Sequence, residues 1–315
     1  MIYVLGSINQ DISLEVERWP KKGETVTADG CTIGLGGKGA NQAVAIAKLG
    51  APLDKPVVKM IGNVGKDSAG GELITKLNSY GVDTEFVHRV NRATGSAVVT
   101  VTPTDNRIVV YGGANSGLSK TDIDEALENA TSADTLLCQL EVPLYVVAYA
   151  LRKARSLGMT TILNPAPAKQ IPDDLFYSID VIIPNETETE ALTGIRPRDG
   201  ESIRNAIYKL HSHGVQYVII TLGERGVALS DGANFMTTIP AFKVAAVDTT
   251  GAGDTFVGAF ALCYPHIGMY SFAEACRFAN RASSIAVTRR GASESIPTAE
   301  EVNAMYVSEI KKIRN

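Results

Sequence analysis

Two glycine-rich stretches of this 315-residue chain could bring backbone amides up to a ligand. Residues 34–39 read GLGGKG and continue into Ala40 and Asn41, whereas residues 251–253 read GAG and continue into Asp254. Glycine lets backbone N–H groups approach another molecule closely, and a helix that starts directly afterwards adds unpaired N–H donors. Each stretch is therefore a candidate binding site, and their neighbours predict different ligands.

The first stretch has the spacing of a dinucleotide-binding turn, with Asp54 in the place of the acid that binds a ribose. Such a turn follows a buried parallel strand, but residues 27–33 are half polar and contain a glycine, which is typical of an exposed antiparallel strand. A P-loop is excluded because Gly39 is followed by Ala40. Asn41 can bond hydroxyls as donor and acceptor, so we expect a polyhydroxy ligand; a tight turn entering a helix is the alternative.

The second stretch favours an anion. Gly251, Ala252 and Gly253 can turn successive N–H groups toward one point at a helix N-terminus, where the helix dipole stabilises negative charge. This geometry suits a phosphoryl group in transfer. Asp254 is then either a helix cap or a base that accepts a substrate proton, and a cap alone would not explain the small residues before it.

The second stretch also resembles a signature of the PfkB family of carbohydrate kinases, D-T-x-G-A-G-D, at residues 248–254. The resemblance continues through residues 6–11, 36–41, 164–167 and 185–188. It implies an α/β fold, in which a three-layer α/β/α core with a mainly parallel sheet carries a small β-sheet lid. It also implies ATP-dependent phosphorylation of a sugar, most closely D-ribose at its 5-hydroxyl.

The resemblance assigns a sugar site to residues from four parts of the chain. They are Asn9, Asp11, Gly37, Lys38, Gly39, Ala40, Asn41, Glu141 and Asp254. Taken alone, Asn9 and Asp11 are turn residues after a strand. Glu141 ends a buried run, which is where open α/β sheets place ligand groups. Asp254 is expected to be the catalytic base, with the amides of Gly251, Ala252 and Gly253 stabilising the transferring phosphoryl group.

A nucleotide site is implied in the same way. Its residues are Asn185, Glu188, Thr221, Gly223, Glu224, Gly226, Gly253 and Asn280. Asn185 and Glu188 are expected to organise Mg²⁺ through waters, because Mg²⁺ dehydrates reluctantly. The same pair is also a helix capping box, and the residues give no preference between the two interpretations.

A site for K⁺ or a similar monovalent cation is implied by the resemblance alone. Its residues are Asp248, Thr250, Ala286, Arg289, Gly291 and Ser295. The histidines do not add a metal site, since His211 and His213 point to different faces of a predicted helix and His88 and His266 are isolated.

The elements that must position these residues follow an α/β order. Apolar runs at 2–8, 135–140, 160–163, 181–183 and 215–221 predict buried strands. Amphipathic or apolar segments predict helices at about 40–49, 121–131, 143–157, 186–193, 201–213, 254–264, 272–287 and 298–313.

Two separated segments, about 12–35 and 95–111, alternate in polarity and predict a small antiparallel sheet, the second as a hairpin. We expect them to form a lid that excludes water from the sugar, within a single catalytic domain spanning 1–315. The resemblance further implies a homodimer through paired lids, and a sheet this small needs cover.

Composition excludes several classes of protein. Thirty basic and 34 acidic residues give a formal charge of −4 without a long basic run, so nucleic acid is not an expected partner. No signal peptide or apolar run of about 18 residues is present, which predicts a cytoplasmic protein with no membrane partner. The four scattered cysteines are expected to be small core residues.

Other acceptors stay open at this stage, namely deoxyribose, another small sugar such as fructose, or a nucleoside. A sugar-binding sensor that has lost catalysis is an alternative of a different class, because a fold does not fix function. Asp254 beside an intact glycine triplet argues against it.

Overall fold

The computed structural model describes residues 1–51, 57–232, 236–264 and 271–314. The connection between Ala51 and Val57, which includes Asp54, therefore lies almost wholly outside the described residues. His266 lies outside them as well.

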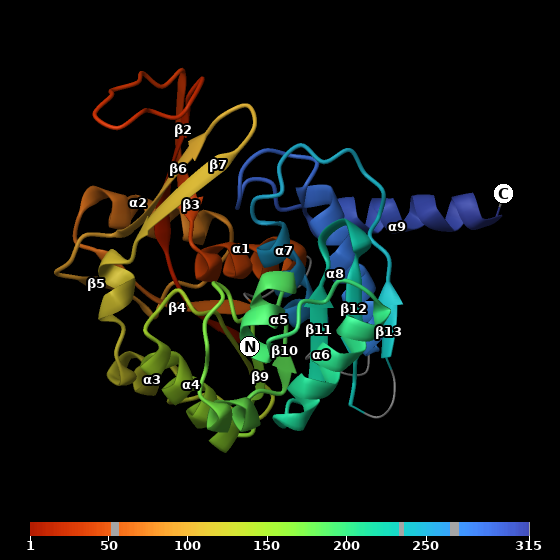
Figure 1. The fold of residues 1–315 in the computed structure, drawn as a ribbon. Coiled ribbons are helices and arrows are strands. Elements are labelled where there is room, and N and C mark those ends of the chain that lie inside the picture. Colours follow the sequence, from red (N-terminus) through yellow and green to blue (C-terminus); the bar gives the residue numbers. More distant parts are fainter. Residues whose placement is uncertain (52–56, 233–235, 265–270, 315) are drawn as a thin grey trace.

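A large sheet forms the middle layer of the molecule (Figure 1). Among the described residues it has nine strands in the order β13-β12-β11-β10-β9-β8-β1-β4-β5. The strands from β11 to β5 are parallel, and β12 and β13 extend one edge antiparallel. Their bounds are β1 Ile2–Leu5, β4 Val58–Gly65, β5 Val87–Val90, β8 Thr135–Cys138, β9 Thr160–Leu163, β10 Val181–Ile182, β11 Tyr217–Thr221, β12 Val227–Ser230 and β13 Met236–Ile239.

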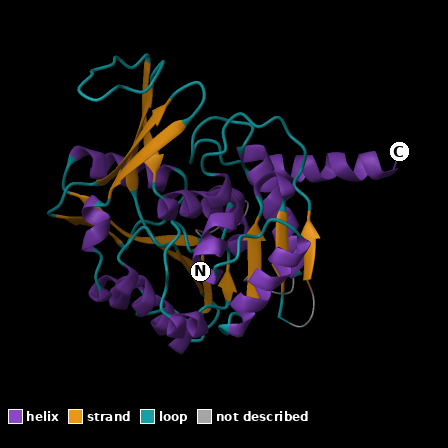
Figure 2. Cartoon of the chain, in the orientation of Figure 1, coloured by secondary structure: helices purple, strands orange, loops and turns teal. Residues whose placement is uncertain are grey.

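Helices cover both faces of this sheet (Figure 2). Their bounds are α1 Lys38–Gly50, α2 Ser68–Ser79, α3 Lys120–Ala126, α4 Leu144–Ser156, α5 Glu186–Thr193, α6 Gly200–Ser212, α7 Ala252–Cys263, α8 Phe272–Ala286 and α9 Ala299–Arg314. One face packs against α1, α2, α7, α8 and the start of α9, and the other against α3 to α6. The expected three-layer α/β/α class is confirmed.

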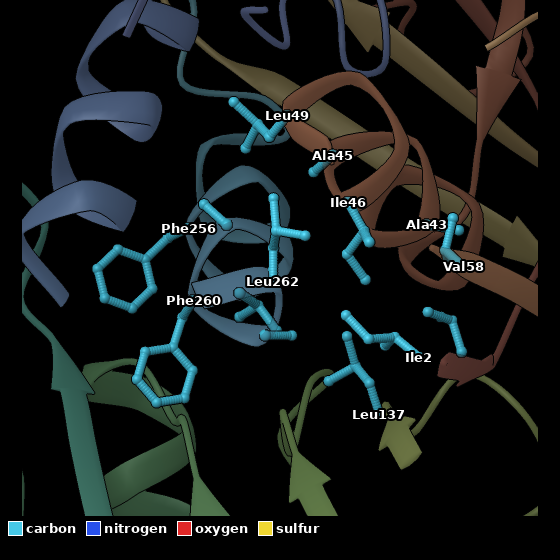
Figure 3. Close-up of a cluster of buried hydrophobic side chains, with 14 of the residues drawn as sticks. Ile2, Ala43, Ala45, Ile46, Leu49, Val58, Leu137, Phe256, Phe260 and Leu262 are labelled. Atoms are coloured by element: carbon cyan, nitrogen blue, oxygen red, sulfur yellow. The ribbon is translucent and has the colours of Figure 1, made fainter. Parts of the chain in front are cut away.

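The central strand shows why the sheet is buried on both sides. Ile2 and Val4 of β1 belong to the core cluster under α1 and α7, whereas Tyr3 and Leu5 belong to the cluster under α3 and α4. Successive strand residues point to opposite faces, so an apolar run of four residues fills both cores. Figure 3 shows the first cluster, where side chains of α1 and α7 gather above the sheet.

A second, four-stranded sheet stands out from the body (Figure 1). Its order is β3-β2-β6-β7, with bounds β2 Asn9–Glu15, β3 Gly30–Gly36, β6 Gly95–Val101 and β7 Asn106–Tyr111. The β2–β3 and β6–β7 pairs are antiparallel, as the alternation of polarity predicts. The sequence did not predict that β2 and β6 pair in parallel, which joins the two separated segments into one sheet. That this sheet acts as a lid stays a prediction.

Two expectations are wrong in detail. The helix expected over 121–131 ends at Ala126, because the N–H groups of Glu128 and Ala130 bond the carbonyls three residues back and form turns in place of further helix. Cys31 is exposed, because β3 is exposed on both faces from Cys31 to Ile33, whereas Cys138, Cys263 and Cys276 are buried as expected. Among the described residues, none of the helices combines the length and apolarity needed to cross a bilayer.

Candidate active site

The expected sugar residues converge at the carboxyl edge of the sheet, where β1 and β8 lie side by side. From these neighbours the chain proceeds in opposite directions, to β4 on one side and to β9 on the other. Open α/β sheets bind ligands at such a switch point. Here the Ser7 hydroxyl donates to Glu141 Oε2 over 2.5 Å, and the Lys38 backbone N–H donates to the same oxygen over 3.0 Å.

The glycines of the first stretch let α1 begin directly against the end of β1. A Cβ added to Gly39 would lie 2.7 Å from the backbone of Gly6, and Gly37 has a φ of 88°, which favours glycine. The Ala40 N–H donates to the Ser7 carbonyl oxygen. The backbone N–H groups of Lys38 and Ala40 are thus bonded within the protein, to Glu141 and to Ser7.

Asp254 lies in the first turn of α7 and is buried, with 7% of its surface exposed. Asn41 Nδ2 donates to Asp254 Oδ2 and Gln42 Nε2 donates to Asp254 Oδ1, each over 3.0 Å. Burial raises the pKa of Asp254, while the positive charge of Lys38 and these two donors oppose the rise. The structure thus brings the expected base of α7 together with the expected sugar residues of α1.

Asn9 and Asp11 open β2 next to this cluster. The Asp11 carboxylate lies directly over Gly36, where an added Cβ would be 2.0 Å from its Cγ. Burial, followed by the charges of Glu141 and Asp254, raises the pKa of Asp11 to about 7. These contacts place Asp11 beside the other two carboxylates.

Lys38 supplies the positive charge among these acids. Its pKa is raised, first by Asp254 and then by Glu141, Glu188 and Asp11, against the effect of burial. Several carboxylates around one ammonium leave the site net negative, which suits hydroxyl donors of a neutral sugar better than an anionic one.

Two acceptors in this cluster have no partner. Among the described residues, the buried oxygens Asp11 Oδ1 and Asn41 Oδ1 accept no hydrogen bond from the protein. An unpaired buried acceptor is costly, so such atoms are expected to bond water or a ligand donor. Sugar hydroxyls supply donors of this kind.

Asn115, which the sequence did not indicate as a site residue, orients Asn9. Asn115 lies in the 3₁₀ turn Gly113–Gly117, accepts from the Ile8 N–H over 2.9 Å and donates to Asn9 Oδ1 over 2.7 Å. The Asn9 oxygen is therefore occupied, and its Nδ2 group is left to face a ligand. Gly95 leaves room for this amide, since a Cβ there would lie 2.2 Å from Asn115 Nδ2. A glycine at this position was the one hint in the sequence that another group approaches closely.

The second glycine stretch forms the N-terminus of α7. Gly251 is the N-cap with a φ of 74°. It has no side chain, so no side-chain cap accepts from the first N–H groups of the helix. The Ala252 N–H bonds the Thr249 carbonyl oxygen over 3.3 Å, whereas a Cβ added to Gly253 would meet no atom within 4 Å. Open space at Gly253 next to the buried carboxylate of Asp254 is compatible with a phosphoryl group.

Asn185 and Glu188 do form a capping box at the start of α5. Glu188 is nevertheless buried, and the charges of Lys38 and Asp254 act on its pKa, which burial raises. In the described part of the chain no three His, Cys, Asp or Glu side chains gather into a direct metal site. The oxygens of Asn185 and Glu188 are ligands of the kind that hold Mg²⁺ through waters, since Mg²⁺ dehydrates reluctantly.

The expected nucleotide turn follows β11, beside α5. The Thr221 N–H donates to the Pro184 carbonyl oxygen over 2.9 Å, and Thr221 pairs with Asn185 in a β-bridge. Gly223 and Gly226 have φ values of 58° and 91°, and Glu224 is exposed between them. Asn280, buried on α8, donates to the Pro240 carbonyl oxygen over 2.8 Å, so its amide supports a neighbouring loop.

The residues expected to hold a monovalent cation lie in two loops that Asp248 ties together. Its Oδ1 accepts from the Thr250 N–H and its Oδ2 from the Gly291 N–H, each over 2.9 Å. These bonds outweigh burial and keep the pKa of Asp248 below its usual range. Arg289 pairs with Glu301 over 2.5 Å. Its guanidinium is itself a cation, so only the Arg289 carbonyl oxygen can be a cation ligand.

The remaining two expected cation residues adjoin the second loop. Ala286 ends α8, and the buried Ser295 donates to the Ala292 carbonyl oxygen over 2.7 Å. Oxygen-rich loops of this kind fit a monovalent cation, and each Asp248 oxygen, which accepts from one donor, keeps a second lone pair.

Comparison with known proteins gives this geometry a context. A ribokinase of Haemophilus influenzae is 42% identical over 300 residues, which are 95% of this chain and 95% of that protein. A deoxyribokinase of Salmonella typhimurium is 38% identical over 305 residues, 96% of this chain and 97% of that protein. The structure of Arabidopsis thaliana ribokinase complexed with ribose and ATP matches with a TM-score of 0.86 and 36% identity, covering 96% of this chain and 97% of the other.

The family model described as pfkB family carbohydrate kinase matches residues 1–299. The sequence, the three-layer fold and the clustered site thus agree with the resemblance inferred from the motifs, and the chain belongs to the pfkB family of carbohydrate kinases.

Proposed function

We propose that the protein phosphorylates D-ribose at its 5-hydroxyl with ATP, giving ribose 5-phosphate and ADP. The observation that carries the proposal is the buried Asp254 carboxylate, which two α1 amides hold beside Lys38 at the glycine-flanked N-terminus of α7. The names of the relatives, ribokinases in most cases, support ribose as the acceptor.

The sugar would bind against β1, β2 and α1. Asp11 Oδ1 and Asn41 Oδ1 accept from its hydroxyls, because both atoms lack a protein partner among the described residues. Asn9 offers its Nδ2 donors, since Asn115 occupies its oxygen. Glu141 holds the turn after β1 and the start of α1 in place through Ser7 and Lys38.

Asp254 accepts the proton of the 5-hydroxyl as that oxygen bonds the γ-phosphorus, and the bond from the γ-phosphorus to the ADP oxygen breaks. General base catalysis supplies about 10²–10⁴-fold, and the larger share of the rate comes from positioning and charge stabilisation. The N–H groups at the start of α7 beyond that of Ala252, together with the ammonium of Lys38, would stabilise the charge of the transferring group.

The nucleotide would lie along the edge formed by the Thr221 to Gly226 turn, with Asn280 beyond it. Mg²⁺ bound with ATP neutralises phosphate charge, and Glu188 and Asn185 would hold its waters. A monovalent cation such as K⁺ between the loops of Asp248 and Gly291 would stabilise the turn that precedes Gly251. Its use of ATP also leads us to place the enzyme in the cytoplasm.

A deoxyribokinase is the specific second candidate, because the Salmonella relative carries that name at 38% identity. Purified protein with ATP and a panel of ribose, deoxyribose, fructose and nucleosides, with and without K⁺, tests both. We expect fastest ADP release with ribose. Faster release with deoxyribose would select the alternative, and sugar binding without ADP release would indicate a sensor.

Asp254→Asn tests the base. We expect turnover to fall by about 10²–10⁴-fold while both substrates still bind, because the amide cannot accept the proton. Nearly full turnover of this variant would exclude Asp254 as the base.

A further inference from the structure

Gln42 is a fully buried amide in α1, next to the carboxylate of Asp254. Its Nε2 donates to Asp254 Oδ1 over 3.0 Å and to Asn164 Oδ1 over 3.1 Å. Its Oε1 accepts from Gln139 Nε2 over 2.6 Å. Both of its amide hydrogens are thus used inside the protein, so Gln42 has no donor left for a substrate.

The orientation of this amide is determined by its neighbours. Asn164 Nδ2 donates to the Ile183 carbonyl oxygen over 2.8 Å, which fixes Asn164 Oδ1 as an acceptor facing Gln42. A reversed Gln42 would place its own oxygen against the oxygens of Asn164 and Asp254, where no hydrogen lies between them. A chain of hydrogen bonds therefore links the Ile183 carbonyl oxygen, through Asn164 and Gln42, to the expected base.

The two helices approach closely enough for this contact because α7 carries a glycine at the crossing. A Cβ added to Gly258 would lie 2.7 Å from the Gln42 carbonyl oxygen and 2.6 Å from Ala45 Cβ. Asp254 and Gly258 are one turn apart and share a helix face. The same face of α7 that touches α1 therefore presents Asp254 to Gln42.

Asn41 completes the arrangement from the other side. Its Nδ2 donates to Asp254 Oδ2, so each carboxylate oxygen receives one donor from an adjacent residue of α1. Two donors on two oxygens fix the rotation of the carboxylate plane and leave a lone pair on each oxygen for a substrate proton.

We propose that Gln42 is a positioning residue for the phosphoryl transfer, which holds the Asp254 carboxylate in the rotation that accepts the proton of the sugar hydroxyl. The assignment rests on the proposed function of Asp254 as the base. Gln42 acts through Asp254 and does not contact either substrate.

The test replaces Gln42 with a side chain of similar volume that has no amide group. Gln42→Met should lower kcat by about 10- to 100-fold, the range of one hydrogen bond to a charged group, with the sugar KM changed less than about threefold. The acid limb of the pH profile should move to higher pH, since losing a donor favours the protonated carboxyl. Thr135→Val, a buried polar substitution at the start of β8 and so at the opposite end of the strand, is the control and should leave kcat unchanged.

A double-mutant cycle with Asp254→Asn separates positioning from general damage. If Gln42 acts through the carboxylate, Gln42→Met should change the residual turnover of Asp254→Asn by less than about twofold. An equal loss in both backgrounds, or a raised sugar KM at constant kcat, would overturn the proposal. Full activity of Asp254→Asn alone would instead remove the proposed base, and the two failures are thereby distinguished.

Gln42→Glu covers the case in which the methionine variant does not fold, because it keeps the shape of the side chain. Two buried carboxyls in contact do not both ionise, so the introduced glutamate and Asp254 should share one proton and titrate as a pair, and a proton held by Asp254 should lower kcat and move the acid limb. An unchanged acid limb and kcat in this variant would contradict the proposed role of Gln42.

Discussion

Asp11 is suited to bind a sugar, but its burial lowers the free energy of unfolding of the protein without a sugar. Burial and the charges of Glu141 and Asp254 raise its pKa to about 7, and one of its oxygens has no partner among the described residues. An isolated aspartate in the unfolded chain titrates near 4. Between these values the folded state binds the extra proton, so the unfolding free energy falls as the pH rises from about 4 through about 7.

We therefore expect Asp11→Asn to stabilise the folded protein as the pH rises, whereas substitutions in a protein usually destabilise it. The variant should gain stability relative to the original protein between pH 5 and pH 8, because the buried charge is absent, and should bind ribose more weakly. Urea unfolding at the two pH values measures the first effect and calorimetric titration with ribose the second. Asp174→Asn, a surface substitution, is the control; an equal pH dependence for Asp11→Asn and the original protein would contradict the assignment.

At the scale of elements, the crossing of α1 and α7 brings the site together, and two helical glycines can test it. Gly258 of α7 lies against α1, whereas Gly71 of α2 has no atom closer than 3.9 Å to an added Cβ. Helix propensity alone predicts that alanine stabilises both positions by up to about 1 kcal/mol. Packing predicts opposite results at the two positions, because an added methyl group would clash with α1 at Gly258 and would meet no close atom at Gly71.

Gly258→Ala should destabilise the protein by about 1–3 kcal/mol through overpacking and lower kcat by moving Asp254 away from Gln42. Gly71→Ala should stabilise it by about 0.4–1 kcal/mol with unchanged kcat. Urea midpoints and steady-state rates of the two variants settle the comparison. A stabilised Gly258→Ala would mean that the helices can separate without cost.

For the whole molecule, local patterns predicted five of the nine strands that the described residues form in the large sheet, and the site residues were inferred from the family resemblance, but neither predicted how distant segments meet. The strand at 160–163 and the helix at 186–193 have the expected bounds, because apolar runs and caps are local signals. The parallel pairing of β2 with β6 and the contacts of Gln42 and Asn115 join residues about 85 to more than 200 positions apart, which no periodicity encodes. Gly37 and Gly39 indicated a close approach correctly, and in the structure both lie against the residues that follow β1.

The small sheet has an exposed apolar edge that predicts an assembly. On the edge strand β7, Ile108, Val109, Val110 and Tyr111 are all exposed, Val109 by 71%. Exposed apolar edge strands invite pairing with another chain, and the family resemblance implies that two such sheets pair. We propose a homodimer in which each sheet covers the other.

Val109→Asp should convert this dimer into a monomer, because a carboxylate cannot be buried unpaired in an apolar interface. Light scattering coupled to gel filtration measures the mass, and the monomer should have a raised ribose KM if pairing orders the sheet over the sugar. Tyr208→Asp, equally exposed on α6, is the control and should stay dimeric. A dimer that persists in Val109→Asp would place the interface elsewhere, whereas a monomeric original protein would show that the apolar edge is not covered by a second copy.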